Sequence, residues 1–163
     1  MKVRLGTIVP NKSDYKSLDY NGLEKRLKSL GFIYKNNAAY FKKEPNIAVK
    51  DKLTKEVITS SDLNIRLNKL NYFEGVNIAS QLALHDFIKE SKKELEAIKR
   101  KATIDVTKEE KANSNTIIQK LNNKIEESQT NLNNLDKQRK RIYEDYHMLS
   151  IAYKESKNQG RTA

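Results

Sequence analysis

The sequence predicts an α+β protein in which a small N-terminal head precedes a long antiparallel helical hairpin or coiled coil. Up to about residue 76 the apolar spacing is mixed and short-range, whereas from about residue 78 it follows alternating steps of four and three, as in heptads. A chain of 163 residues has room for one compact domain and an extension, or for two small units. We therefore expect a basic head at residues 1–76 and a stalk at residues 77–163.

The head begins with a predicted strand and a predicted helix. Alternate apolar positions within residues 3–9 are typical of a half-buried strand, and Pro10 ends it. For the following helix, Asn21 is a suitable N-cap and Gly31 a suitable stop. The apolar stripe of this helix consists of Leu23, Leu27 and Leu30.

The stretch FIYKNNAAYFKK predicts a β-hairpin. The two asparagines at 36–37 tolerate the positive φ angles of a type I′ turn between two aromatic-rich runs. A two-residue loop would place Phe32 opposite Phe41, and Tyr34 opposite Ala39. These four side chains would share one face and fix the register.

The remainder of the head carries weaker patterns. Residues 46–49 and 56–59 are candidate strands, and Ser61 is placed to cap a helix. The leucines of that helix are Leu63, Leu67 and Leu70. Strand, helix, hairpin and helix together predict the small α+β head.

The stalk contains two heptad seams separated by the polar segment KATIDV. The first runs from Leu84 to Ala102 and the second from Ile118 to Tyr153, and neither Pro nor Gly occurs in residues 76–159. Thr107 and Glu110 form a capping box for the second helix. An antiparallel hairpin is the preferred interpretation, and one continuous rod is the alternative.

A bend at residues 105 and 106 would make the two arms unequal. Helix 78–103 would be about 39 Å long and helix 108–157 about 75 Å, so the longer arm lacks a partner beyond roughly residue 133. Its seam residues would then need the head or a second chain to cover them, and we expect a homodimer through the long helix. The residues of this oligomer seam are Leu135, Ile142, Leu149 and Tyr153.

A basic cluster, KQRKR at residues 137–141, interrupts the second seam at Arg139. The hairpin geometry places this cluster beside the head. Arg139 is therefore expected to face the head, to pair with a carboxylate such as Glu74, or to point its guanidinium at a ligand phosphate.

The charge indicates binding to a polyanion. The chain has 32 Lys+Arg against 21 Asp+Glu, a net charge of +11. Residues 1–76 carry 15 against 8 and residues 77–163 carry 17 against 13, so the head is the more basic part. Biased composition is an alternative explanation for the number of lysines. For the lysines on the hairpin, a second alternative is that they protect an exposed strand edge from pairing with another chain. The predicted binding residues are Lys25, Arg26, Lys28, Tyr34, Lys35, Tyr40, Lys42, Lys43, Lys137, Arg139, Lys140 and Arg141.

No catalytic, metal-binding or cofactor-binding pattern is identifiable. Cysteine is absent, there are only two histidines, and no Gly-rich phosphate loop occurs. The hairpin register keeps His85 and His147 apart. We expect a non-enzymatic protein without metal or cofactor.

These features favour a basic binding protein that engages nucleic acid or a nucleoprotein complex through the head and the stalk base, with the coiled coil for dimerisation. One alternative is a small phage- or plasmid-type inhibitor, comparable to an anti-CRISPR protein, that docks on a host nucleic-acid enzyme such as a nuclease. Another is a coiled-coil adaptor. The absence of a signal-peptide pattern and of an 18-residue apolar run predicts a cytoplasmic protein with no membrane partner.

Overall fold

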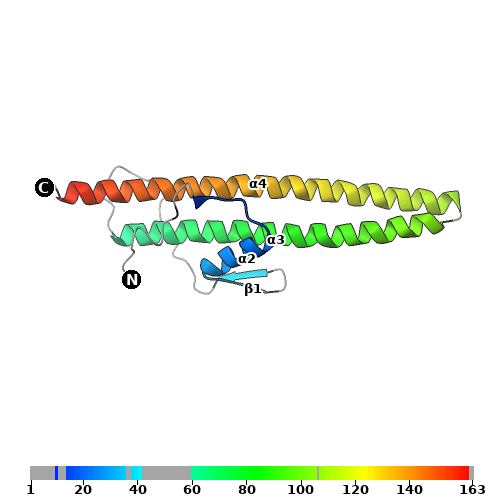
Figure 1. Cartoon of the computed structure of the whole chain (residues 1–163), viewed down its shortest axis with the longest axis horizontal. Helices are drawn as coiled ribbons and strands as arrows, with labels where there is room; N and C mark the ends of the chain where they lie inside the picture. The colour runs from blue at the N-terminus through cyan, green and yellow to red at the C-terminus, as the bar shows by residue number, and fades with distance from the viewer. Residues whose placement is uncertain (1–9, 11–13, 36–37, 42–59, 106, 162–163) are drawn as a thin grey trace.

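The protein is a long antiparallel helical hairpin with a small unit packed on one side (Figure 1). The computed structural model describes residues 10, 14–35, 38–41, 60–105 and 107–161. The arms of the hairpin are α3, Ser60–Ile104, and α4, Lys108–Arg161. The side unit consists of α2, Tyr20–Ser29, with strands β1, Phe32–Lys35, and β2, Ala38–Phe41.

The predicted α+β fold class is wrong, because the fold is a helical hairpin rather than an α+β head on a stalk. Strand structure within the described residues is limited to β1 and β2, which have four residues each. The predicted boundary between residues 76 and 77 falls inside the 45-residue helix α3. The helix expected at the end of the head and the first arm of the stalk are therefore one element.

The continuity of α3 follows from its heptad spacing. Counting back from Leu84 in alternating steps of three and four gives Gln81, Asn77, Glu74, Leu70, Leu67 and Leu63. These positions lie on one side of a single helix. Because three of these residues are polar, this part of the seam is not detected when only apolar residues are counted.

α2 begins two residues earlier than a cap at Asn21 would allow. Asp19 is the N-cap, and its side chain accepts a hydrogen bond from the backbone N–H of Gly22 over 2.8 Å. The helix ends before Gly31, whose φ of 94° is the left-handed conformation that glycine adopts without strain. The predicted stop is confirmed, and the predicted cap is wrong.

β1 and β2 pair antiparallel, with Phe32 opposite Phe41 and Tyr34 opposite Ala39, as the turn prediction requires. This two-stranded unit packs against the helical hairpin through Phe32. Phe32 packs with buried residues of α2 and α3. Together these residues form one hydrophobic core cluster, which consists of Leu23, Leu27, Phe32, Ile78 and Leu82. The strands expected at residues 3–9, 46–49 and 56–59 lie outside the described residues.

The turn of the hairpin agrees with the sequence prediction, and the alternative of a continuous rod is wrong. The side chain of Thr107 accepts a hydrogen bond from the Glu110 backbone N–H over 3.1 Å, which is one half of the expected capping box. Buried Asp105, directly after α3, accepts a hydrogen bond from the hydroxyl of Ser114 over 2.6 Å, which joins the turn to α4.

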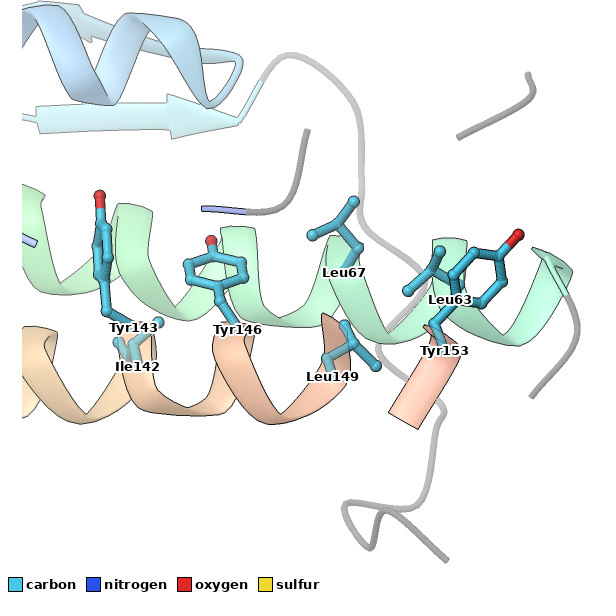
Figure 2. Packing of buried hydrophobic residues seen from close by; sticks show 7 residues of the cluster. All are labelled: Leu63, Leu67, Ile142, Tyr143, Tyr146, Leu149 and Tyr153. Atoms are coloured by element: carbon cyan, nitrogen blue, oxygen red, sulfur yellow. The ribbon is translucent and has the colours of Figure 1, made fainter. Parts of the chain in front are cut away.

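The long arm has a partner along the region where we expected none. Because α3 starts at Ser60, its first turns lie beside the C-terminal part of α4 (Figure 2). Leu63 and Leu67 from α3 form one buried cluster with residues of α4. The α4 members are Ile142, Tyr143, Tyr146, Leu149 and Tyr153. Each fully buried leucine contributes about 1.5–3 kcal/mol to stability.

Candidate functional site

A buried cluster of charged side chains lies at the base of the hairpin, where α2, α3 and α4 meet. Its centre is Glu74 of α3, whose side chain has no exposed surface. Arg26 of α2 donates from Nη2 to Oε1 of Glu74 over 2.7 Å, and from Nε to Oε2 over 3.0 Å. Arg139 of α4 donates from Nε to the same Oε2 over 3.2 Å. One carboxylate thus joins three helices through two guanidinium groups.

Arg139 also binds the chain that precedes α2. Its Nη1 donates to the backbone carbonyl of Lys16 over 2.8 Å, and its Nη2 donates to the hydroxyl of Tyr143 over 3.2 Å. The guanidinium carbon lies 5.3 Å from the ring centre of Tyr15 and 5.1 Å from that of Tyr143. Pairing with Glu74, one of the expected roles of Arg139, is confirmed. A side chain that is 2% exposed does not reach a ligand phosphate in this structure.

The segment at residues 14–19 is further attached to α4 through Asp136. The hydroxyl of Tyr15 donates to Oδ1 of Asp136 over 2.6 Å, and the hydroxyl of Ser17 donates to Oδ2 over 2.6 Å. The Tyr15 ring meets the Tyr143 ring edge-on at 5.4 Å. The segment therefore crosses from α4 to α2 and is held at both ends.

Polar side chains also set the register between the two arms. Nδ2 of Asn77 donates to the backbone carbonyl of Leu135 over 2.9 Å, and Nε2 of Gln81 donates to Oδ1 of Asn77 over 2.7 Å. The hydroxyl of Tyr146 donates to Oδ1 of Asn71 over 2.6 Å. Because a buried polar group is costly without its partner, these bonds oppose sliding of α4 along α3.

The surroundings of Glu74 shift the pKa values of its neighbours. Burial raises the pKa of Tyr146 well above its usual value, and the negative charge of Glu74 raises it further. The same two causes raise the pKa of Tyr143. Burial lowers the pKa of Arg26, but the hydrogen bonds to Glu74 and its charge outweigh that effect and raise the pKa overall. At neutral pH the two phenols are neutral and Arg26 is charged, so the cluster binds elements together and offers no exposed base.

Of the predicted binding residues, the structure brings Arg26 and Arg139 together, at Glu74. Lys25 and Lys28 are exposed on α2. The predicted residues Lys137, Lys140 and Arg141 are exposed on α4. Tyr34, Lys35 and Tyr40 belong to β1 and β2, but their side chains are not described. Lys42 and Lys43 lie outside the described residues.

The residues of the predicted oligomer seam pack within one chain. Ile142, Leu149 and Tyr153 are buried between α3 and α4, and Leu135 is half-buried. The reason for expecting a second chain to cover them no longer applies, since the first turns of α3 cover them.

The sequence analysis named Glu74 and Arg139 as a pair but did not predict the rest of the cluster. Arg26 was expected on a binding surface, and Tyr15, Tyr143 and Tyr146 were not singled out as members of a site. The heptad positions of Glu74 and Arg139 were the available signal, because both occupy seam positions that face the other arm.

Comparison with protein families, with characterised proteins and with solved structures found no match. Within the described parts of the chain, no group of three or more His, Asp or Glu side chains is arranged to hold a metal ion. Over the same residues, neither the length nor the apolarity of any helix suits a membrane crossing.

Proposed function

We propose that this protein is a non-enzymatic binding protein whose base end engages the phosphate backbone of nucleic acid. The base end is defined as the described residues within 1–84 and 129–161, and the distal half as those within 85–128, which form the free tip of the hairpin. The observation that supports the proposal is the distribution of charge between these two parts.

The distal half is nearly neutral, with 10 Lys+Arg against 9 Asp+Glu. The described residues of the base end carry 14 Lys+Arg against 9 Asp+Glu, a net of +5 compared with +1 for the distal half. Biased composition alone would give both parts a similar excess of positive charge, because the distal half is also rich in lysine. An excess concentrated at one end of an elongated molecule creates a local positive potential that attracts a polyanion.

The buried cluster changes which residues carry the proposed contacts. Arg26 and Arg139 are committed to Glu74, so the proposed contacts belong to exposed lysines. Lys25 and Lys28 of α2 and Lys137 and Lys140 of α4 are exposed at the base end. Lysine ammonium groups bind phosphate as point charges and read no base sequence, so we expect binding that is independent of sequence.

Charge reversal at matched positions tests the proposal. The variant Lys137→Glu with Lys140→Glu changes two exposed residues of the base end, and Lys89→Glu with Lys92→Glu makes the same change at the same spacing in the distal half. Fluorescence anisotropy with labelled single-stranded and duplex oligonucleotides is measured over a series of salt concentrations. We expect the base-end variant to weaken binding by roughly tenfold or more at low salt, and the distal variant to have a much smaller effect.

Equal losses in the two variants, or no binding by the unmodified protein at low salt, would contradict the proposal. Absence of binding is the result expected for the alternative functions, an inhibitor docking on a nucleic-acid enzyme and a coiled-coil adaptor. The homodimer also stays a prediction, although the seam on α4 is no longer the reason for it.

A further inference from the structure

α3 carries three heptad stripes at its base-end half, and two of them are covered. One stripe contains Glu74 and Asn77, which bond to α4. A second contains Ile78 and Leu82, which pack under α2. Among the described residues no second helix covers the third stripe in this way, although Nζ of Lys69 in the same helix lies 5.7 Å from the centre of the Phe73 ring. We call this third stripe the open stripe. It consists of Phe73, Val76, Ser80, Ala83 and Phe87.

The open stripe is apolar and accessible. Phe73, Val76 and Phe87 are 44%, 44% and 43% exposed, which is high for residues of this size. Spacings of three, four, three and four keep the stripe on one side of the helix for about 21 Å. Its first part borders a shallow groove between α3 and α4, lined on the α4 side by Leu135, Gln138 and Arg141. A surface with this spacing and a groove beside it fits another helix.

We propose that the open stripe binds the open stripe of a second copy of this chain, antiparallel and about a two-fold axis at Ser80. Ser80 is the middle residue of the stripe, with Phe73 seven residues before it and Phe87 seven residues after it. Phe73 would then lie opposite the partner's Phe87, and Val76 close to the partner's Ala83. Val76 is four residues before Ser80 and Ala83 three after it, so these two positions would be offset by one residue, about 1.5 Å along the helix. The small residues at and near the axis allow the two helices to approach closely, while the large rings cover the ends.

Charge at the two ends of the stripe selects this arrangement over a parallel one. Lys69 lies one turn before Phe73, and Glu90 lies one turn after Phe87. One turn further out on each side are Arg66 and Glu94. Antiparallel pairing about Ser80 places the basic end of each stripe at the acidic end of the other, whereas parallel pairing places like charges together.

This dimer is independent of nucleic-acid binding, because it rests on α3 and uses none of the lysines proposed to contact phosphate. The ion pairs it predicts are also diagnostic. Lys69 and Glu90 of one chain are about 31 Å apart along a straight helix, so they do not pair within the chain.

The first test measures the mass of the full-length protein by sedimentation equilibrium over a range of concentrations. We expect the mass of two chains at high concentration. The variant Ser80→Arg places two like charges at the axis, and we expect it to raise the dimer dissociation constant by more than about a hundredfold. Asn123→Arg adds the same charge at an exposed position of α4 in the distal half and should leave the dimer unchanged.

The second test examines the orientation. Lys69→Glu and Glu90→Lys should each raise the dissociation constant, by roughly tenfold, and combining them in one chain should restore it to within about twofold of the original value. A monomer at every concentration, a Ser80→Arg variant that dimerises normally, or a double variant with no recovery would overturn the proposal. Circular dichroism of each variant verifies that the helices are retained.

Discussion

Arg139 of α4 and Glu74 of α3 form an ion pair between two almost fully buried side chains, with 3.2 Å between Nε and Oε2. The pair lies at heptad positions where apolar residues would ordinarily pack. A second arginine from α2 and two tyrosines from α4 surround the carboxylate. This relationship makes the base of the hairpin depend on one acidic residue.

Removing that acid should be strongly destabilising. In Glu74→Leu, Arg139 remains buried without its counter-charge, and we expect the free energy of unfolding to fall by about 3–5 kcal/mol. Chemical denaturation monitored by circular dichroism measures the change. The exposed residue Glu96 provides the control, because Glu96→Leu should change stability by less than about 0.5 kcal/mol. Similar losses in the two variants would show that the cluster contributes little.

Removing both partners should be less damaging than removing the acid alone. Glu74→Leu with Arg139→Leu leaves no buried charge in the seam, and Arg26, whose side chain is 25% exposed, can turn toward water. We expect the double variant to be more stable than Glu74→Leu by about 2 kcal/mol. The measurement is a double-mutant cycle of unfolding free energies. Simple addition of the two single losses would argue against direct coupling.

Stability should fall at alkaline pH. The pKa values of Tyr143 and Tyr146 are raised in the folded protein above the usual value of about 10, so their contribution is complete below pH 10 and is lost as the pH rises through the raised values. Urea unfolding at about pH 8 and at pH values above 10 measures the loss. The variant Tyr146→Phe removes one ionising phenol and keeps every lysine. Its free energy of unfolding should therefore fall less between these pH values than that of the unmodified protein. An equal loss in both proteins would assign the effect to other groups.

Gly75 should not tolerate alanine, although alanine normally favours a helix by about 1 kcal/mol over glycine. A Cβ at this position would overlap the ring of Phe32, which packs directly on the helix backbone. We expect Gly75→Ala to destabilise the protein by about 1–3 kcal/mol in thermal or urea unfolding. Combining it with Phe32→Ala removes the overlap, so the added cost of Gly75→Ala should disappear in that background. A stabilised single variant would contradict the close approach.

Local patterns predicted the elements that depend on local interactions. The capping residue Thr107, the stop at Gly31 and the register of β1 against β2 each follow from a few neighbouring residues. The antiparallel hairpin also followed, because the polar segment at residues 101–106 breaks the heptads. The pairing of Arg139 with Glu74 was predictable because both lie at seam positions near the base.

The extent of α3 was not predicted, because polar residues occupy its seam where it passes the base. Glu74 was assigned to the end of the head, and Asn77 and Gln81 precede Leu84, the first residue of the predicted seam. In the structure Glu74 and Asn77 bond to α4, and Gln81 bonds to Asn77. This error made the long arm seem unpartnered and suggested a dimer seam on it.

The attachment of the segment before α2 was not predictable from spacing. Tyr15 contacts Asp136 and Tyr143, more than 100 positions away in the chain, and no periodic pattern links them. The partner of Arg26 was not predictable from spacing either, because it is determined by how α2 packs on α3. The contacts of Tyr15 and Arg26 depend on tertiary packing and not on local conformational preference.

Protection of lysines by bound nucleic acid tests the proposed function most directly. The protein is acetylated with and without a saturating single-stranded oligonucleotide at low salt, and the modification of each lysine is quantified by mass spectrometry. We predict protection of Lys25, Lys28, Lys137 and Lys140, with no change at Lys89, Lys92, Lys120 and Lys124 of the distal half. Equal protection along the hairpin, or protection confined to the distal half, would contradict a binding surface at the base end.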